Sequence, residues 1–504
     1  MTTEKKVAKK PAARKVVKKA AKKQSNLGRN FRIGLVAVQA ITSVLFIVSL
    51  VSMHIINGRD VFLLATAFIA LLLLSAIKLL KENPSRAAKI TCTTISILCI
   101  IGSVVAFRFT DAFNSFLNKI TQRDPETKEY SVLVLPESNI THLETLKDKN
   151  IGYLKSDPKA GSAENYLQEK VKHEASFYDD VDTITGVLNS KISDAIVLES
   201  DRINAMKEET ENAIKNATII YTFEIELDAE EIEIVEKDVS SEPFVLYISG
   251  SDSRSGIKAT ARSDVNIVAV VNPKQGKILL VSIPRDTYVQ LHGTTGLKDK
   301  LTHAGIYGIN MSKTTIEDLL STKIDYTAKV SFDTVVKIVD QIDGIEIESD
   351  KDLHLRVEGK QKFCDFKVGI QHVDGDCALR FARERKSYAT GDRHRGENQQ
   401  QVIASIIAKL SSSRDYLLKL PSILDIAADS FETSLSRDDI TDFIRLQLDK
   451  NIKWEVESIY VNGAGSYQPT YSMGANRPLY VMITYPDSLN SAKTKIAEYM
   501  YLWL

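Results

Sequence analysis

The sequence predicts a membrane-anchored α/β protein with three membrane-spanning helices, a small α/β domain and a larger C-terminal α/β domain. The larger domain is expected to hold a central mixed sheet flanked by helices. Three observations predict this: long apolar runs before residue 108, alternating strand-like and helix-like segments from residue 129, and an uneven charge distribution. The 504 residues carry 65 basic and 65 acidic side chains, and 44% are hydrophobic, which excludes a disordered chain. Four cysteines exclude a disulfide-dense secreted scaffold.

A basic tail occupies residues 1–32. It has twelve Lys and Arg against the single acid Glu4, a charge of +11 that leaves −11 for the remainder. Such a tail can bind nucleic acid, or it can mark the cytoplasmic side and lie on anionic lipid, at about 1 kcal/mol per basic residue. Because it has no aromatic residue before Phe31 and no DNA-reading motif, we favour membrane lipid, and nucleic acid is not expected as a partner.

Three apolar runs, residues 33–56, 61–80 and 90–107, are each long enough to cross a bilayer, which takes about 17–25 residues. Three runs in succession argue against a cleaved signal peptide or soluble buried helices. We therefore assign residues 33–108 to three transmembrane helices. The basic tail and the loop 81–89, with three basic residues, should both face the cytoplasm, so the chain after Arg108 should lie outside the cell.

The segment 125–236 predicts an extracytoplasmic accessory domain. Strands are expected at 130–135, 151–154 and 195–198, and helices at 142–149, 163–171 and 201–214. This alternation predicts a parallel or mixed sheet covered by helices. No motif here carries chemistry, so a spacer or docking role is the simplest interpretation, with the acidic run 224–236 as a connecting strand or linker.

The segment 240–504 predicts the second extracytoplasmic domain. Strands are expected at 244–248, 265–271 and 277–282, and helices at 314–320 and 331–342. The last two strands form a hairpin that should bring Asp264 and Arg285 to one edge, where Asp252 follows a neighbouring strand. Charged groups gathered at strand ends are typical of sites in α/β proteins.

A dense charged stretch follows at 378–400. If 378–385 is a strand, Arg383 and Arg385 share a face, and if a helix begins near Arg395, that residue and Gln399 stack four apart. One guanidinium group can bind two phosphate oxygens at once. Several arginines in one site therefore favour a ligand with more than one negative charge. Aspartates beside such a ligand favour Mg²⁺, which binds one or two carboxylates plus substrate phosphates. The pattern predicts a metal-assisted pyrophosphate site.

The four cysteines fall into two pairs. Cys92 and Cys99 lie within the third membrane helix and are expected to be small apolar side chains. Cys364 and Cys377 lie outside the membrane in an oxidising setting, where a disulfide would stabilise the fold by about 3 kcal/mol; the alternative is two buried thiols.

From Pro243 onward the chain resembles the LytR-CpsA-Psr (LCP) family of bacterial cell-envelope ligases. The resemblance rests on the phrases GSDSR, ARSDVNIVAVVNPKQGKILLVSIPRDTYV, IEDLL with IDYTAKVSFDTVVKIVDQIDGIEI, and ALRFARERKSYATGDRHRGENQQQVI. Three membrane helices and an accessory domain are similar to the CpsA-like capsule branch. The resemblance implies transfer of an anionic glycopolymer, most simply capsular polysaccharide, from a polyprenyl-pyrophosphate carrier to a peptidoglycan hydroxyl. It also implies Mg²⁺, or Mn²⁺ in its place, a hydrophobic tunnel for the prenyl tail, and other capsule-assembly proteins as further partners.

The family's site residues carry over by motif. Asp252 and Asp264 match the metal-associated aspartates, and Arg262 is the neighbouring arginine. The residues that match the pyrophosphate-binding and catalytic set are Arg285, Arg383, Arg385, Arg395 and Gln399. Lys300 matches a lysine after the phrase PRD, although the surrounding KLTHAG departs from the family's usual Asn-Ala pair.

Two other functions remain open from the sequence. A membrane-bound regulator of capsule or envelope assembly would use the tail for a cytoplasmic partner and the outer domain only for sensing. A polyprenyl-pyrophosphate phosphatase would release the phosphate to water instead of transferring it to an acceptor.

Overall fold

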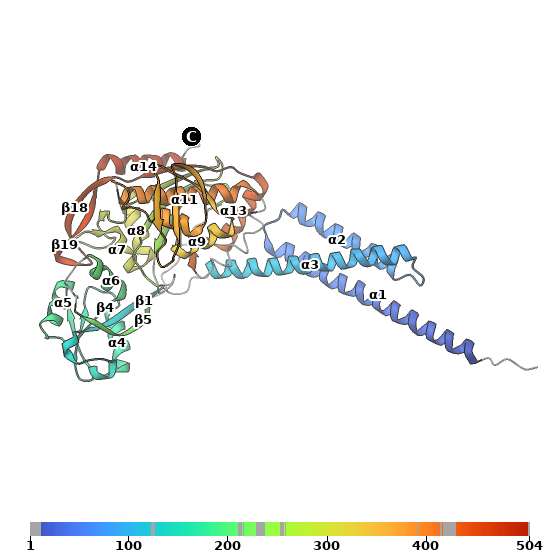
Figure 1. Cartoon of the computed structure of the whole chain (residues 1–504), viewed down its shortest axis with the longest axis horizontal. Coiled ribbons are helices and arrows are strands. Elements are labelled where there is room, and N and C mark those ends of the chain that lie inside the picture. The colour runs from blue at the N-terminus through green and yellow to red at the C-terminus, as the bar shows by residue number, and fades with distance from the viewer. Residues whose placement is uncertain are drawn as a thin grey trace, which may run out of the picture. The chain divides into compact units, whose positions relative to one another are not determined.

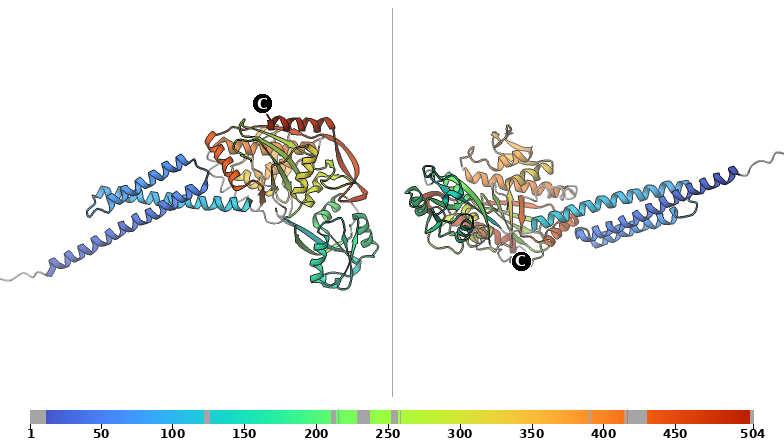
Figure 2. Two further views of the ribbon diagram at one scale, coloured as in Figure 1. Left: turned by 180° about the vertical axis from the view of Figure 1, so that it is seen from behind. Right: turned by 90° about the horizontal axis from the view of Figure 1, so that it is seen from below.

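A computed structural model describes residues 12–121, 126–209, 214, 216–227, 237–251, 257, 259–389, 391–413, 416 and 430–501. The chain forms two compact units, residues 1–115 and 116–504. Figures 1 and 2 follow the chain from blue to red through both units.

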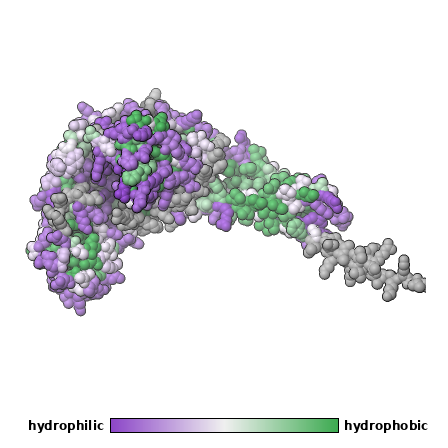
Figure 3. Space-filling model, viewed as in Figure 1, coloured by the Kyte–Doolittle hydropathy of each residue, from purple (hydrophilic) through white to green (hydrophobic). Residues whose placement is uncertain are grey.

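The N-terminal unit is helical. Its helices are α1 (Ala12–Met53), α2 (Gly58–Leu79) and α3 (Arg86–Thr121). All three are long and apolar enough to cross a membrane, as expected, with the first span beginning at Gly28. Hydrophobic residues make up much of the helical surface visible in Figure 3, and Cys92 and Cys99 are buried free thiols. α1 ends three residues earlier than the expected run, and α3 continues beyond residue 108, so that its last turns belong to the second unit.

The accessory domain is built on a five-stranded mixed sheet of order β3-β2-β4-β1-β5. Its strands are β1 (Thr127–Val134), β2 (Asn150–Leu154), β3 (Glu174–Tyr178), β4 (Ala195–Glu199) and β5 (Thr218–Glu226). β2 runs parallel to β3 and β4, whereas β1 is antiparallel to β4 and β5. The helices are α4 (Ala160–Lys170), α5 (Val181–Asn189) and α6 (Ser200–Glu209), with short 3₁₀ turns η1 (Pro136–Ser138) and η2 (Leu143–Leu146).

The expected strands and the mixed sheet are confirmed, but three details of the accessory domain differ. The expected helix 142–149 is only the turn η2, because just Leu143 and Leu146 are buried there. β3 and α5 had not been expected: β3 is an edge strand whose side chains are mostly exposed, so it lacks an apolar pattern. β5 takes up the first part of the acidic run, whereas residues 228–236 lie outside the described residues.

The C-terminal domain is built on a six-stranded mixed sheet of order β16-β11-β6-β7-β8-β17. Its strands are β6 (Phe244–Ser251), β7 (Val265–Asn272), β8 (Lys277–Ser282), β11 (Tyr326–Ser331), β16 (Phe431–Thr433) and β17 (Glu455–Tyr460). β6 is parallel to β11 and β8 to β17, while β7 is antiparallel to both β6 and β8. The expected hairpin of β7 and β8 is confirmed. Four strands therefore end at the edge where β7 begins.

Helices cover both faces of this sheet. One face packs against α8 (Ile309–Leu320) and α14 (Pro486–Tyr501) through side chains such as Ile316 and Ile496. The other packs against α11 (Asp392–Ser412) and α13 (Arg437–Lys450) through side chains such as Ile403 and Phe443. α11 and α14 can be followed in Figures 1 and 2. The three layers explain why β7 is buried along its whole length.

Smaller elements surround this core. They are β9 (Tyr288–Val289), β10 (Asp299–Lys300), α7 (Leu301–Ala304), η3 (Gly305–Tyr307), α9 (Phe332–Gln341), β12 (Ile345–Ser349), β13 (Leu353–Arg356), β14 (Phe363–Phe366), β15 (Gly369–Val373), α10 (Gly375–Ala382), β18 (Gly463–Thr470) and β19 (Gly474–Thr484). β12 pairs with β15, β13 with β14, and β18 with β19.

The strand expected at residues 378–385 was wrong. The segment forms helix α10, which Asp374 caps by accepting a hydrogen bond from the Cys377 N–H, and Arg383 is its C-cap. The buried residues Ala378, Phe381 and Ala382 follow the helical spacing of three and four. The charged side chains between these buried residues give an alternating polar and apolar pattern that is also typical of a strand.

Candidate functional site

The site lies at the edge of the large sheet where β6, β8, β11 and β17 end. Asp264 immediately precedes β7, and Arg285 follows the end of β8 by three residues. Arg285 donates from Nη1 to Asp264 Oδ1 at 2.7 Å, so the expected meeting of these residues is confirmed. The antiparallel hairpin brings the start of one strand beside the end of the next.

A cavity of about 720 Å³ opens at this edge. Seven of the residues that the sequence singled out line it: Arg262, Asp264, Arg285, Arg383, Arg385, Arg395 and Gln399. α11 provides Arg395 and Gln399 four apart on one face, as expected. Arg383 and Arg385 reach the same cavity from the turn after α10, although not by strand alternation.

Positive charge dominates this cavity. Nine basic and six acidic side chains line it, so it is suited to an anion. Burial opposes ionisation of Asp264, but the charges of Arg285 and Arg262 outweigh it and lower its pKa. Burial, helped by the charges of Arg285 and Arg385, lowers the pKa of Arg395. An anionic ligand would relieve this repulsion among the arginines.

The turn that carries Arg383 and Arg385 is held by a buried carboxylate. Glu384 accepts hydrogen bonds from Arg380 Nη2 at 2.6 Å and from the Ser387 N–H at 2.9 Å. Burial opposes ionisation, but these bonds outweigh it and lower the pKa of Glu384. Arg383 also lies 3.2 Å from Glu358, so this guanidinium already has an ion-pair partner.

One expected residue, Lys300, is not seen in this group. Lys300 is buried in β10, where its ammonium lies 3.1 Å from Asp286 Oδ1, and it is not among the described residues that line the cavity. The contact of Lys300 with the ligand therefore stays a prediction. Asp252 lies outside the described residues.

The donor set for a metal was tested on the described residues. Within those residues, no three His, Cys, Asp or Glu side chains form a ligand cluster. Asp264 is a cavity-lining carboxylate, and Mg²⁺ commonly takes only one or two carboxylates together with substrate phosphates. Of the two predicted ligands the structure describes Asp264 alone, so Mg²⁺ at this position stays a prediction.

Sequence reasoning missed one charged neighbour of the arginines. Asp392, at the start of α11, forms an ion pair with Arg395. Burial raises its pKa, against the opposing charge of Arg395. Together with Arg385 it also lines a second cavity of about 900 Å³, whose lining is partly polar and partly apolar. Its position in the phrase GDRHRG, three residues before Arg395, is the signal that could have identified it.

An apolar cavity of about 380 Å³ lies on the α11 and α13 face of the sheet. Ile403 and Ile407 line it, four and eight residues beyond Gln399, so one face of α11 connects the polar cavity to the apolar one. Trp454 and, from the end of α3, Phe116 complete part of its wall. The hydrophobic tunnel implied by the resemblance has a counterpart here.

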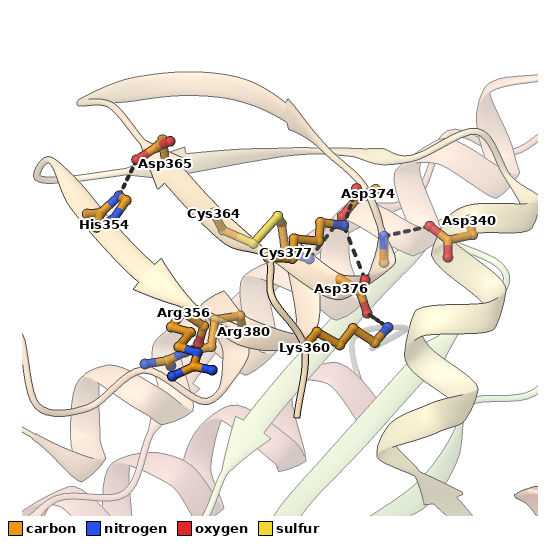
Figure 4. The surroundings of a disulfide bond; sticks show 12 residues. Asp340, His354, Arg356, Lys360, Cys364, Asp365, Asp374, Asp376, Cys377 and Arg380 are labelled. Carbon is orange, nitrogen blue, oxygen red and sulfur yellow. Dashed lines mark hydrogen bonds and ion pairs between the residues drawn. A yellow bond between two sulfur atoms is a disulfide. The ribbon is translucent and has the colours of Figure 1, made fainter. Parts of the chain in front are cut away.

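A disulfide braces the segment behind the arginine turn (Figure 4). Cys364 of β14 and Cys377 of α10 are bonded, with Cα atoms 5.5 Å apart, as expected. On the exposed side, Lys360 lies against Asp376. α10 is thereby tied to the β13–β14 hairpin immediately before Arg383.

The architecture defines a class: a protein with three helices long and apolar enough to cross a membrane, followed by an α/β domain with an arginine-lined cavity and an apolar cavity. A family model described as the LytR_cpsA_psr family matches residues 197–486. The chain belongs to this family.

Named relatives agree with this membership. The polyisoprenyl-teichoic acid–peptidoglycan teichoic acid transferase TagU of Bacillus mycoides (strain KBAB4) is 34% identical over 226 residues, which are 45% of this chain and 70% of TagU. TagV of Bacillus subtilis (strain 168), named as the same kind of transferase, is 29% identical over 263 residues, 51% of this chain and 64% of TagV. The crystal structure of B. subtilis TagV is 27% identical, with a TM-score of 0.42 over 52% of this chain and 98% of that one.

Proposed function

We propose that this protein transfers an anionic glycopolymer from a polyprenyl-pyrophosphate carrier to a sugar hydroxyl of peptidoglycan. The polymer most in keeping with three membrane helices and an accessory domain is capsular polysaccharide. The observation that carries the proposal is that α11 lines both an arginine-rich cavity, through Arg395 and Gln399, and an apolar one, through Ile403 and Ile407. A polyprenyl pyrophosphate has the same two parts, a polyanionic head and an apolar tail.

The relatives support the reaction class. TagU and TagV are named as transferases that act on polyisoprenyl-linked teichoic acid and peptidoglycan. The charge distribution supports the compartment, because the +11 tail would keep the N-terminus in the cytoplasm and place the domains outside. Both substrates are then found on the side where the cavities lie.

In the proposed reaction, an acceptor hydroxyl oxygen attacks the phosphorus that bears the glycan. The bond from this phosphorus to the bridging oxygen breaks, polyprenyl phosphate leaves with the electron pair, and a phosphodiester remains. Arg285, Arg383, Arg385 and Arg395 stabilise the negative charge that develops on the phosphate oxygens and the leaving group. Mg²⁺ held at Asp264, when bound, would supply further charge neutralisation.

The acceptor's proton needs a base, and we assign it to Asp392. Asp392 lines the cavity of about 900 Å³, and its carboxylate pairs with Arg395, which lines the arginine-rich cavity. The cavity of about 900 Å³ also contains the aromatic rings of Tyr460 and Tyr480, which suit the apolar faces of sugars.

The test uses the full-length protein in lipid nanodiscs with a polyprenyl-pyrophosphoryl oligosaccharide and peptidoglycan oligomers. We expect a phosphodiester-linked product, lost on chelation by EDTA and restored by Mg²⁺. Arg383→Ala and Arg385→Ala should each lower transfer about 100-fold, in the range for removal of one charge-stabilising donor. Arg356→Ala, an exposed arginine of β13, is the matched control.

Unchanged transfer by both cavity variants would contradict the proposal. Release of free glycan phosphate without a peptidoglycan adduct would identify a phosphatase instead. A regulator would be favoured if neither product formed and if deletion of residues 2–30 altered the expression of envelope genes.

A further inference from the structure

One wall of the arginine-lined cavity comes from the accessory domain. Helix α6 places Asp201, Asn204 and Lys207 three residues apart, so they share one face, and all three line the cavity. Its other face inserts Ile203 and Met206 into the accessory core, where neither is exposed. One face of α6 therefore packs in the accessory core, and the other lines the cavity.

This wall is fixed to the C-terminal domain. Asp201 Oδ2 accepts a hydrogen bond from the Arg262 N–H at 2.6 Å. The Thr260 N–H donates to the Thr127 carbonyl oxygen at 2.9 Å. The accessory core continues into the C-terminal domain, since Ile306 and Met473 belong to the same cluster as Ile203. α6 therefore faces the arginines as a rigid surface.

The two walls of the cavity have different chemistry. One presents guanidinium groups suited to phosphate oxygens. The other presents a carboxylate, an amide and an ammonium group, a mixture of acceptors and donors that suits hydroxyl groups. Asn204 and Lys207 are exposed, so they can reorient toward a ligand. A volume of about 720 Å³ falls among pockets that enclose a whole small molecule, so a sugar fits beside the phosphates.

We propose that α6 binds the first hexose of the donor glycan, the one bonded to the pyrophosphate, so that the accessory domain takes part in selecting the glycan. This inference rests on the proposed function, because it needs the pyrophosphate on the arginine wall. Asn204 and Lys207 are the specificity-determining residues of this subsite. Asp201 positions α6 through its bond to the Arg262 N–H.

The experiment compares two probes on the full-length protein in nanodiscs: farnesyl pyrophosphate and farnesyl-pyrophosphoryl-glucose. We expect the wild type to bind the sugar-bearing probe more tightly. In the double variant Asn204→Ala/Lys207→Ala, affinity for the sugar-bearing probe should fall about ten-fold, while affinity for farnesyl pyrophosphate should stay within about two-fold. Lys155→Ala, an exposed lysine on the same domain, is the matched control.

Each outcome has one meaning. Equal losses for both probes would show that Lys207 only attracts phosphate, and an unchanged preference for the sugar-bearing probe would show that α6 does not contact the donor sugar; either overturns the inference. No preference for the sugar in the wild type would overturn it too. Failure of the wild type to bind farnesyl pyrophosphate, or full binding by Arg385→Ala, would instead count against the proposed function.

Discussion

A buried ion network beside the cavity holds the accessory domain in place, and Arg202→Ala tests its strength. Arg202 is 1% exposed and donates to both oxygens of Glu199, at 2.7 and 2.9 Å. It also donates to the Ser472 carbonyl oxygen of the C-terminal domain. Lys128 lies 3.1 Å from Glu199 and 2.9 Å from Asp157. Two cations thus balance two carboxylates away from water.

Removing one partner of a buried ion pair costs about 3–5 kcal/mol. We expect the lower end, about 3 kcal/mol, because Lys128 would still neutralise part of the charge on Glu199. In domains of 150–250 residues, 1 kcal/mol moves Tm by about 2–4 °C, so Tm should fall by about 6–12 °C.

The effect should also depend on pH. Burial opposes ionisation of Glu199, but Arg202 and Lys128 outweigh it and lower its pKa. A carboxyl group whose pKa is lower in the folded state stabilises the fold above its unfolded pKa, about 4.3, and loses this contribution as pH falls. The gap between wild type and Arg202→Ala should therefore narrow on acidification below about pH 4.

Differential scanning fluorimetry of the full-length protein in detergent measures both effects. The control is Lys155→Ala, which removes an exposed ion pair to Asp179 and should change Tm by about 1 °C or less. If Arg202→Ala melted within about 1 °C of this control, the network would not hold the domain and the reasoning would be refuted.

Three further predictions address the Cys364–Cys377 disulfide, the apolar cavity and the proposed general base Asp392. Replacing both Cys364 and Cys377 by serine should cost about 3 kcal/mol, and dithiothreitol should lower the Tm of the wild type but not of this variant; equal sensitivity of both would exclude the bond as the cause. Ile407→Trp should fill the apolar cavity and weaken binding of a long-chain polyprenyl pyrophosphate, while inorganic pyrophosphate binds as before in calorimetry; a parallel loss for both ligands would show general damage. Burial raises the pKa of Asp392, and only its ionised form accepts a proton. The transfer rate should therefore fall as the pH is lowered, and the fall should begin at a higher pH than the usual aspartate pKa of about 4 would give. If the Asp392→Asn variant showed the same fall in transfer rate at low pH, another group would be the base.

The large sheet could be predicted because its strands carry their own signals. β7 and β8 are continuous apolar runs separated by a polar turn, so both the hairpin and the meeting of Asp264 with Arg285 follow from local sequence. The disulfide was predicted from the expectation that Cys364 and Cys377 lie in an oxidising compartment.

Features that depend on tertiary packing could not be predicted. Arg383 and Arg385 were placed in the right cavity with the wrong secondary structure, since the charge pattern of α10 is compatible with a strand until its burial is known. The part played by α6 depends on the contact between Asp201 and Arg262, 61 residues apart. The ion pair between Lys300 and Asp286 could not be predicted either, because these residues become neighbours only when β9 and β10 pair.

The last turns of α3 have a practical consequence for producing the accessory and C-terminal domains without the N-terminal helices. Phe116 and Leu117 are fully buried, and Phe116 and Ile120 form part of the apolar cavity wall. A fragment that begins after Thr121 would open that wall to water and present an apolar patch prone to self-association. One that begins between residues 109 and 115 keeps the helix end that closes the cavity. The boundary suitable for a soluble fragment therefore lies inside α3, not after it.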